Sequence, residues 1–479
     1  MTVRYEPFSK SDIERIDAAT IRVLERTGVR VLEPEAVKLL EGAGASFDRK
    51  TSVVKIPERV LKDCISSAPS KFKLHSRDGK HVLSFGEGNV YHSSVGTPVN
   101  AEGLDGVVRP STAKDVENFY KLTDSLPNID HSSWACWPRD VNEDVAHLWE
   151  VYLAFKHSNK TTDGYNWGRD RTEDLLDLAA IAAGGRDDLA KKPQILGFVN
   201  PVSPLTMSKE LTEGLISFAR AGQPCCYPPE CMAGGTSPAT VAGLLVQQNA
   251  EVLPCIVVAQ LAKRLAPVFY ASVSGMMDMR TGSIVLGSAE IGLIMAGAAQ
   301  LARHYRIPIR GTGGNTESMV VDYQAGVESM STLLMASLAG IDFIYDSAGS
   351  IESSLTASYA KMVLDDDMCG MVKRILAGAD TSEESLATEV IESTGLKGGY
   401  LSSPHTLRHY KSEAFVGQNF WRGARTSWAN YKQKDIVAKA KKRAEQLINE
   451  HVMRTPLDPE TDRKMMEFIK KVEKRGYPK

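Results

Sequence analysis

A repeated pairing of a short apolar run with a longer amphipathic segment most constrains how this 479-residue chain can fold. The apolar runs predict strands at residues 89–93, 132–136, 161–165, 194–199, 224–227, 267–271, 308–312 and 342–345. Helical periodicity predicts helices at residues 113–125, 143–158, 172–183, 208–221, 239–263, 287–305, 322–338 and 354–377. Eight strands with intervening helices are typical of the (β/α)8 TIM barrel, an α/β fold.

An open doubly wound sheet is the competing architecture. It normally carries a glycine-rich phosphate turn after its first strand. Residues 93–98 read Ser-Ser-Val-Gly-Thr-Pro and do not match that turn. Several runs are apolar throughout, as in strands covered on both faces. The barrel is therefore the favoured prediction.

The chain divides into three predicted parts: an N-terminal helical cap at 1–85, the barrel at 86–380 and a C-terminal helical extension at 381–479. Ser11, with Glu14 three residues later, predicts a capping box at the start of the first helix. Residues 437–451 and 462–474 predict amphipathic helices within the extension.

Composition excludes several classes of protein. A net charge of −2 provides no basic surface for nucleic acid. Residues 1–14 lack the apolar core of a signal peptide, which predicts a cytoplasmic protein. The apolar stretch 284–301 contains Glu290 and predicts a buried helix rather than a membrane span. Seven cysteines without a CxxC pair predict reduced thiols.

Metal and hydrolase motifs are missing from the sequence. His405 and His409 share a helical spacing but lack the glutamate of a zinc-protease motif, and no Cys/His group has zinc spacing. No GxSxG nucleophile elbow occurs. We therefore expect no bound metal and no acyl-enzyme chemistry.

Aromatic residues gather at the predicted carboxyl ends of the strands, where TIM barrels place their active sites. A cage of rings can hold a quaternary ammonium, which has no N–H to donate. The candidates for such a cage are Tyr91, Trp167, Phe198 and Tyr227. Any single ring is more often one that fills the barrel or packs a loop, whereas the group as a whole favours a cation site.

Charged candidates lie at the same ends. Arg310 follows the seventh strand and is suited to bind a carboxylate, although Glu317 or Asp346 are alternative partners. Glu230 and Glu352 are suited to offset a cationic substrate or to form salt bridges.

Several runs carry a family resemblance that spans the chain. They are residues 232–238, 248–253, 277–282, 310–314, 322–326, 344–353 and 358–366. Together they resemble the trimethylamine methyltransferase family. The resemblance implies a (β/α)8 barrel without a permanent cofactor, which transfers a methyl group to the corrinoid (cobalamin) of a transiently docked partner protein.

The resemblance also bears on the substrate. Trimethylamine-using members carry pyrrolysine in or near the loop after the seventh strand, where this chain has Thr316-Glu317-Ser318. The chain thus resembles the branch without pyrrolysine, whose members demethylate glycine betaine, proline betaine, carnitine or butyrobetaine. Many relatives have Asp-Ser-Lys where this chain has Glu317-Ser318-Met319. Glycine betaine, yielding dimethylglycine, is the leading expectation, with Arg310 as the carboxylate anchor. The methyl transfer that the resemblance implies needs no catalytic side chain, so the site residues would only position the substrate.

Two other classes of function stay open. A barrel lyase or aldolase would favour a Schiff-base lysine at a strand end, and the predicted strand ends offer none. A non-catalytic betaine-binding protein would share the cage but would need no corrinoid partner. The sequence also leaves open whether the protein is a homo-oligomer.

Overall fold

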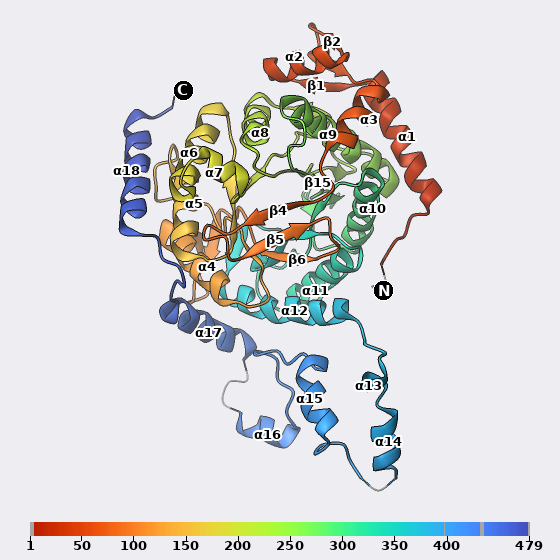
Figure 1. The fold of residues 1–479 in the computed structure, drawn as a ribbon, viewed down its shortest axis with the longest axis vertical. Coiled ribbons are helices and arrows are strands. Elements are labelled where there is room, and N and C mark those ends of the chain that lie inside the picture. Colours follow the sequence, from red (N-terminus) through yellow and green to blue (C-terminus); the bar gives the residue numbers. More distant parts are fainter. Residues whose placement is uncertain (1–3, 397, 432–434, 478–479) are drawn as a thin grey trace.

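Eight parallel strands form a closed barrel in the computed structural model, which describes residues 4–396, 398–431 and 435–477 (Figure 1). The strands are β6 (Tyr91–Ser94), β9 (His131–Ser132), β10 (Thr161–Tyr165), β11 (Ile195–Phe198), β13 (Cys225–Tyr227), β15 (Val268–Ala271), β18 (Ile309–Thr312) and β19 (Phe343–Ala348). β19 pairs with β6 and closes the ring. The predicted TIM-barrel fold is confirmed, and each barrel strand lies at or beside its predicted position.

Helices surround the barrel between these strands. They are α4 (Ala113–Ser125), α5 (Ala146–His157), α6 (Arg169–Ala183), α7 (Arg186–Lys191), α8 (Lys209–Ala221), α9 (Val241–Ala262), α10 (Ala289–Tyr305), α11 (Tyr323–Leu338) and α12 (Tyr359–Ala377). α9 is long and apolar enough to cross a membrane, yet 72% of its apolar window is buried in the protein. It is therefore a core helix that packs between the barrel and the N-terminal helices.

Two apolar clusters follow from the alternation of side chains along each strand. The larger cluster lies between the strands and the helices and includes Tyr227 and Tyr270. The smaller cluster lies inside the barrel and includes Cys226, Phe269 and Tyr345. The face on which a side chain lies therefore decides whether it can reach the barrel interior.

The N-terminal cap is mixed rather than wholly helical. It contains α1 (Lys10–Arg26), α2 (Pro34–Ala43), α3 (Glu58–Ser67), β1 (Val29–Val31), β2 (Ser46–Asp48), β3 (Val53–Lys55), β4 (Phe72–His75) and β5 (Val82–Phe85). The helix cap predicted at Ser11 is wrong by two residues, because Ser9 and Asp12 form the capping box. The β4–β5 hairpin lies across the end of the barrel at which the strands begin (Figure 1).

Phe85 anchors this hairpin inside the barrel. Its ring centroid lies 4.8 Å from that of Phe269, 5.8 Å from that of Phe343 and 5.5 Å from that of Tyr91. These edge-on contacts are the favoured geometry for aromatic pairs. The hairpin thus closes one end of the barrel and leaves the carboxyl ends of the strands as the functional side.

Short sheets extend the loops of the barrel. One contains β14 (Met232–Ala233), β16 (Gly275–Met277) and β17 (Ile284–Val285); another contains β7 (Asn100–Glu102), β8 (Val108–Pro110), β20 (Ser350–Ile351) and β21 (Thr356–Ser358). The loop strand β12 (Thr206–Met207) joins β1 and ties the cap to the barrel.

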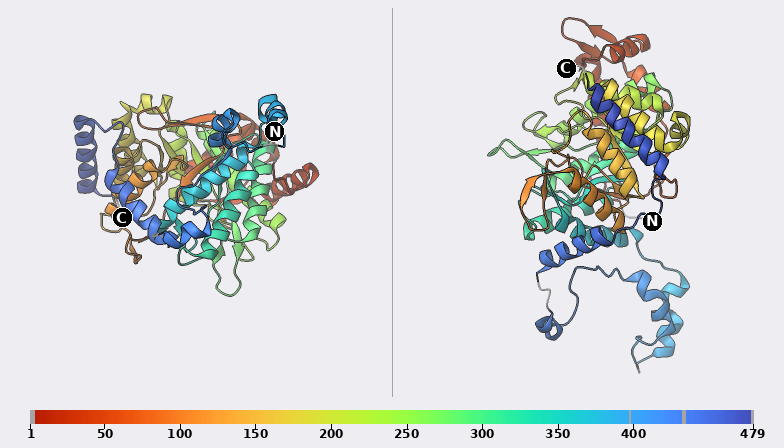
Figure 2. Two further views of the ribbon diagram at one scale, coloured as in Figure 1. Left: turned by 90° about the horizontal axis from the view of Figure 1, so that it is seen from below. Right: turned by 90° about the vertical axis from the view of Figure 1, so that its left-hand side faces the viewer.

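The C-terminal extension is helical, as predicted. It comprises α13 (Glu383–Leu386), α14 (Thr388–Thr394), α15 (Pro404–Glu413), α16 (Arg425–Asn430), α17 (Ile436–Glu450) and α18 (Pro459–Arg475). α17 packs against α12, and α18 packs against α5 and α6 (Figure 2). The helices α13 to α16 instead project away from the barrel.

Candidate active site

Arg310 lies inside the barrel near the carboxyl ends of the strands and is 1% exposed. Its guanidinium carbon lies 4.2 Å from the ring centroid of Tyr345 and 4.8 Å from that of Phe198. One nitrogen reaches the carbonyl oxygen of Ser272 at 3.5 Å, and its Nε has no partner. Among the described residues Arg310 forms no ion pair, so most of its donors are free to receive an anion.

Aromatic rings extend from Phe198 towards the solvent. Trp134 lies 6.1 Å from Phe198 and 5.0 Å from Tyr165, measured between ring centroids. Tyr165 also lies 5.4 Å from Trp137 and stacks on Trp167 at 6.2 Å. Trp167 is 40% exposed whereas Trp134 is buried. This group, the aromatic cluster, therefore leads from the surface to the ring that covers Arg310.

Two acids balance the charge of Arg310. Burial raises the pKa of Asp346, and Arg310 opposes that rise. Burial also raises the pKa of Glu230, with a further rise from Asp346 and an opposing effect of Arg310. Glu230 is exposed to solvent at the surface, although neighbouring protein atoms desolvate its carboxylate. Both acids thus share one electrostatic environment with Arg310.

Asp346 owes its place to an irregularity in β19. The pairing of β19 with β6 shifts register between Ile344 and Ala348, and Asp346 has a left-handed backbone with φ of 61°. Its carboxylate accepts hydrogen bonds from the Gly96 amide at 3.2 Å and the Thr312 hydroxyl at 3.3 Å. Such backbone is rare outside glycine and costs about 1–3 kcal/mol, a strain often found at functional sites.

A polar network inside the barrel fixes the ring of Tyr345. The Tyr345 hydroxyl donates to Oδ2 of Asp163 at 2.8 Å, and Oδ1 of Asp163 lies 2.9 Å from Nε2 of His131. Nδ1 of His131 lies 2.8 Å from the Thr161 hydroxyl. The three groups hold the ring on which the guanidinium of Arg310 rests.

The structure brings together only part of the predicted site. Arg310 and Phe198 are in contact, Glu230 interacts with Arg310 through its charge, and Trp167 joins them through Tyr165. Phe198 is covered by Arg310, so that face of its ring is already occupied by a cation.

Tyr91 and Tyr227 do not belong to this group. Tyr91 is the first residue of β6, and its hydroxyl accepts from the Ser84 amide at 3.1 Å, at the closed end of the barrel. Tyr227 lies in the core between strands and helices, because its neighbour Cys226 takes the inward position. Their placement in the predicted cage is wrong: Tyr91 lies at the other end of its strand, and Tyr227 faces the other side of the sheet.

The hydrogen bond of Glu352 also involves no residue of the Arg310 group. Its carboxylate accepts a hydrogen bond from the Thr356 hydroxyl at 2.5 Å, within its own loop. Glu317, the other partner considered for Arg310, accepts instead from the amides of Leu286 and Gly287 at 2.8 and 3.1 Å. Both acids thus stabilise loops.

Four residues of the site were not among the predicted site residues: Trp134, Tyr165, Tyr345 and Asp346. The signal for Tyr165 and Tyr345 was the alternation of each strand, since both face inward with Phe198 and Phe343. The sequence offered Asp346 only as an alternative partner of Arg310, because its direction depends on an irregularity of the strand.

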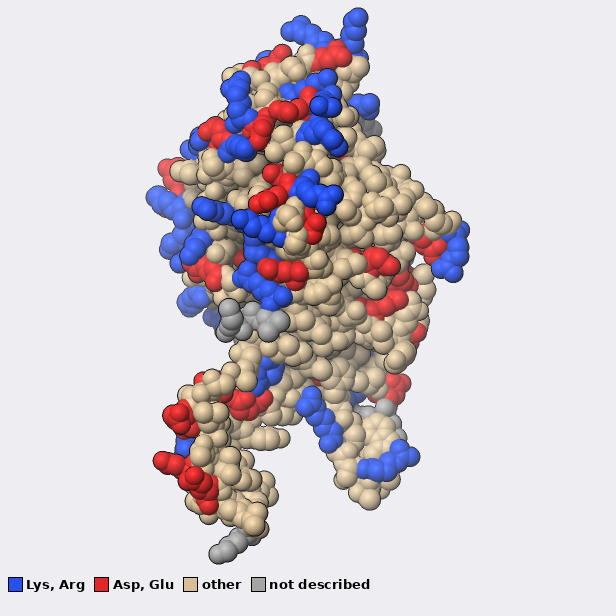
Figure 3. All heavy atoms as spheres, turned by 90° about the vertical axis from the view of Figure 1, so that its right-hand side faces the viewer, with Lys and Arg blue, Asp and Glu red and all other residues tan. Residues whose placement is uncertain are grey.

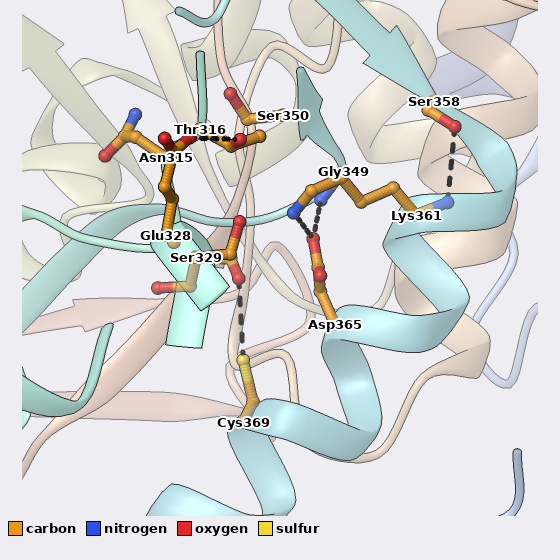
Figure 4. Close-up of polar contacts among 12 residues, drawn as sticks. Asn315, Thr316, Glu328, Ser329, Gly349, Ser350, Ser358, Lys361, Asp365 and Cys369 are labelled. Carbon is orange, nitrogen blue, oxygen red and sulfur yellow. Dashed lines mark hydrogen bonds and ion pairs between the residues drawn. The ribbon is translucent and has the colours of Figure 1, made fainter. Parts of the chain in front are cut away.

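Polar contacts tie the loops after β18 and β19 to α11 and α12 (Figure 4). Oε2 of Glu328 accepts from the Thr316 hydroxyl at 2.7 Å and from the Glu317 amide at 2.9 Å. Oδ2 of Asp365 accepts from the Gly349 amide at 2.8 Å and from the buried Lys361 at 2.6 Å. Gly349, Lys361 and Asp365 belong to two of the sequence runs that carry the family resemblance.

Metal ligands are not assembled in the part of the chain that the structure describes, since no group of three or more His, Cys, Asp or Glu side chains is placed to hold an ion. His405 and His409 lie close together in the C-terminal extension, where Nε2 of His409 is 3.0 Å from Glu384. All seven cysteines are buried and unpaired.

Comparison with known proteins identifies the family. The model of the trimethylamine methyltransferase (MTTB) family matches residues 1–476. A glycine betaine methyltransferase of Desulfitobacterium hafniense (strain Y51) is 35% identical over 97% of both chains. A trimethylamine methyltransferase of Desulfitobacterium hafniense (strain DSM 10664 / DCB-2) is 33% identical over 93% of this chain and 89% of that protein.

A solved structure supports the fold. The monomethylamine methyltransferase of Methanosarcina barkeri superimposes with a TM-score of 0.54, covering 94% of this chain and 90% of that chain at 12% identity. The full-length family match, the two relatives above 30% identity and the closed barrel agree. The chain belongs to the trimethylamine methyltransferase (MTTB) family and is a methyltransferase.

Proposed function

We propose that this cytoplasmic methyltransferase removes a methyl group from a carboxylated quaternary amine, foremost glycine betaine, and transfers it to Co(I) of a corrinoid protein. The buried, under-bonded guanidinium of Arg310 is the observation that carries the proposal. Buried N–H donors without acceptors are costly, and a substrate carboxylate would accept hydrogen bonds from them. Trimethylamine has no such group.

The cationic end of the substrate would lie against the aromatic cluster. Phe198 and Tyr345 already face Arg310, so the rings left for a quaternary ammonium are those of Trp134, Trp137, Tyr165 and Trp167. Glu230 and Asp346 would offset its positive charge. This assignment keeps Trp167 from the predicted cage and replaces Tyr91 and Tyr227.

The chemistry asks for positioning rather than acid–base catalysis. The C–N bond breaks, its electron pair stays on nitrogen, and Co(I) supplies the pair for the new Co–CH3 bond as it becomes Co(III). The leaving amine is neutral and needs no proton to depart. Rings and carboxylates that only hold the ammonium in line with the incoming cobalt would suffice.

A methyl-transfer assay tests this proposal. The protein is mixed with glycine betaine and chemically reduced cobalamin, and the spectral change from Co(I) to methyl-Co(III) is followed while dimethylglycine is quantified. We expect both products in equal amounts. Transfer from trimethylamine in the absence of transfer from glycine betaine, proline betaine, carnitine or butyrobetaine would overturn the proposed substrate class.

The relative named a glycine betaine methyltransferase supports glycine betaine over the longer betaines. A panel of the four betaines orders them directly. Carnitine and butyrobetaine place the carboxylate farther from the ammonium and cannot engage Arg310 and the aromatic cluster in the same way, whereas proline betaine keeps the spacing of glycine betaine and adds a ring.

A further inference from the structure

The helices α13 to α16 form an arm that leaves the barrel after α12 and returns at α17 (Figures 1 and 2). None of the residues of these four helices is buried. They are only 4, 7, 10 and 6 residues long. Isolated helices shorter than about 12–15 residues are marginal in water, so these helices need a packing partner.

The arm nevertheless displays large apolar side chains. Leu401 is 89% and Leu407 73% exposed, and Leu386, Ile391 and Tyr410 are also exposed. Towards its return, Trp421 lies 5.6 Å from Trp428 and 4.5 Å from Tyr431 between ring centroids. Trp and Tyr are the residues that most often dominate the binding energy of protein interfaces.

Among the described residues, the arm is tied to the rest of its own chain at its base. The carboxylate of Asp367 on α12 accepts hydrogen bonds from the amides of Gln418 and Asn419 at 3.0 and 2.7 Å. Arg374 on α12 bonds to Glu413 at 2.6 Å. These contacts hold the arm in a defined direction but leave its apolar residues uncovered.

Charge is divided along the arm (Figure 3). Residues 379–395 contain five acids and no Lys or Arg: Asp380, Glu383, Glu384, Glu389 and Glu392. Residues 404–431 contain four bases and one acid: Arg408, Lys411, Arg422, Arg425 and Glu413. Glu384 pairs with Arg408 and His409 in the same chain. Among the described residues, Glu389, Glu392, Arg422 and Arg425 have no ion pair.

Acidic α14 and the basic segment around α16 lie on opposite sides of the arm (Figures 1 and 3). A twofold axis would bring α14 of one copy against α16 of another, and the reverse pairing would follow by symmetry. Such self-complementarity is what an isologous dimer interface requires. A transient partner would leave the apolar residues exposed between encounters, which disfavours it as the occupant.

We propose that the arm is a dimerisation element that packs against the arm of a second copy of this chain. The helix α12 ends at the closed end of the barrel, since Ala377 lies in one surface pocket with Tyr91 and Gly340. The arm therefore leaves from the end opposite the candidate active site. Dimerisation through it keeps the carboxyl ends of the strands open.

The mass of the intact protein tests this inference. Native mass spectrometry and light scattering at micromolar concentration should give a dimer or a multiple of it. The double variant Ile391→Asp/Leu407→Asp should give a mass reduced by half or more. Its far-ultraviolet circular dichroism spectrum should match that of the wild type, which shows that the fold is kept. The control Leu265→Asp, at a residue 70% exposed outside the arm, should keep the wild-type mass.

Limited proteolysis supplies a second readout. The wild-type arm should resist cleavage, and the arm of Ile391→Asp/Leu407→Asp should be cut while the barrel survives. A monomeric wild-type protein, or a double variant with the wild-type mass and resistance, would overturn the inference.

Charge reversal tests the pairing itself. Glu389→Lys/Glu392→Lys and Arg422→Glu/Arg425→Glu should each raise the dimer dissociation constant at least tenfold. The variant that combines all four changes should recover most of the affinity, because each copy then presents the reversed pair. Equal weakening in the combined variant would exclude the α14–α16 pairing.

Discussion

At the scale of residues, the site depends on an arginine whose donors are incompletely used. The guanidinium rests between Phe198 and Tyr345 and reaches the protein through one long hydrogen bond. The planar fork of arginine matches a carboxylate in a way that lysine does not. Arg310 therefore has both the free donors and the fixed orientation to anchor a betaine.

Replacing Arg310 should weaken the binding of glycine betaine. Hydrogen bonds to charged groups contribute about 1.5–3 kcal/mol, so Arg310→Ala should raise the Kd about 10- to 100-fold. Arg310→Lys should fall between wild type and Arg310→Ala because it keeps charge without the fork. Titration calorimetry measures both, with choline as the control ligand: it lacks a carboxylate, and a matching loss for choline would refute the anchor.

Removing the Tyr345 hydroxyl should affect the stability of the protein but not the binding of substrate. Tyr345→Phe keeps the ring over Arg310 but leaves Oδ2 of Asp163 without its donor. The free energy of unfolding should fall by about 1–3 kcal/mol, whereas the Kd for glycine betaine should change less than threefold, about 0.7 kcal/mol. Urea unfolding and calorimetry give the two values; a large loss of affinity at unchanged stability would contradict this division.

Prediction from sequence succeeded for strands and fell short for side-chain direction. The strand 161–165 was predicted at its true bounds because an apolar run is a local property. Tyr227 was assigned to the wrong face of its strand. Side chains alternate between the two faces, but tertiary packing decides which residues of the strand face the barrel interior. The sequence offered Asp346 as an alternative partner of Arg310 but could not predict its left-handed backbone, since the irregularity of β19 depends on its pairing with β6.

At the scale of elements, the β4–β5 hairpin works as a plug and not as part of the site. Phe85→Ala removes a ring that packs on Phe269 and Phe343 inside the barrel. The stability of the protein should fall by about 3–5 kcal/mol, the usual cost of truncating a buried Phe. The Kd for glycine betaine should stay within threefold in the folded variant. Denaturant unfolding and calorimetry report these; unchanged stability would show that the hairpin is not a plug.

The surrounding helices and strands bury histidines, which predicts acid sensitivity. Burial lowers the pKa of His92 on β6 to about 4 and that of His147 on α5 to about 3. In the unfolded chain both titrate near the usual value of about 6.5. The unfolded state therefore binds more protons below that pH, and stability falls as the pH decreases.

His147→Gln should reduce this pH dependence. Each such histidine accounts for about 2 kcal/mol of stability lost between pH 7.5 and pH 5. Urea unfolding of wild type and variant at the two pH values gives the difference. The same loss in both proteins would mean that His147 does not stay neutral in the folded state.

At the scale of the whole molecule, the closed and open ends of the barrel have separate tasks. The hairpin and the base of the arm lie at the closed end, and Arg310, Glu230 and the aromatic cluster lie towards the other. The proposed corrinoid partner would have to approach the substrate, and this division leaves the open end for it. The proposed dimer and the proposed methyl transfer are thus independent of each other and can fail separately.

The ratio of kcat/KM for glycine betaine to that for trimethylamine tests the central claim most directly. With reduced cobalamin as the acceptor, the wild-type protein should favour glycine betaine, and Arg310→Ala should lower that ratio about 10- to 100-fold, equivalent to about 1.5–3 kcal/mol. A wild-type protein that favours trimethylamine, or a ratio that Arg310→Ala leaves unchanged, would contradict the proposed recognition of a carboxylated quaternary amine.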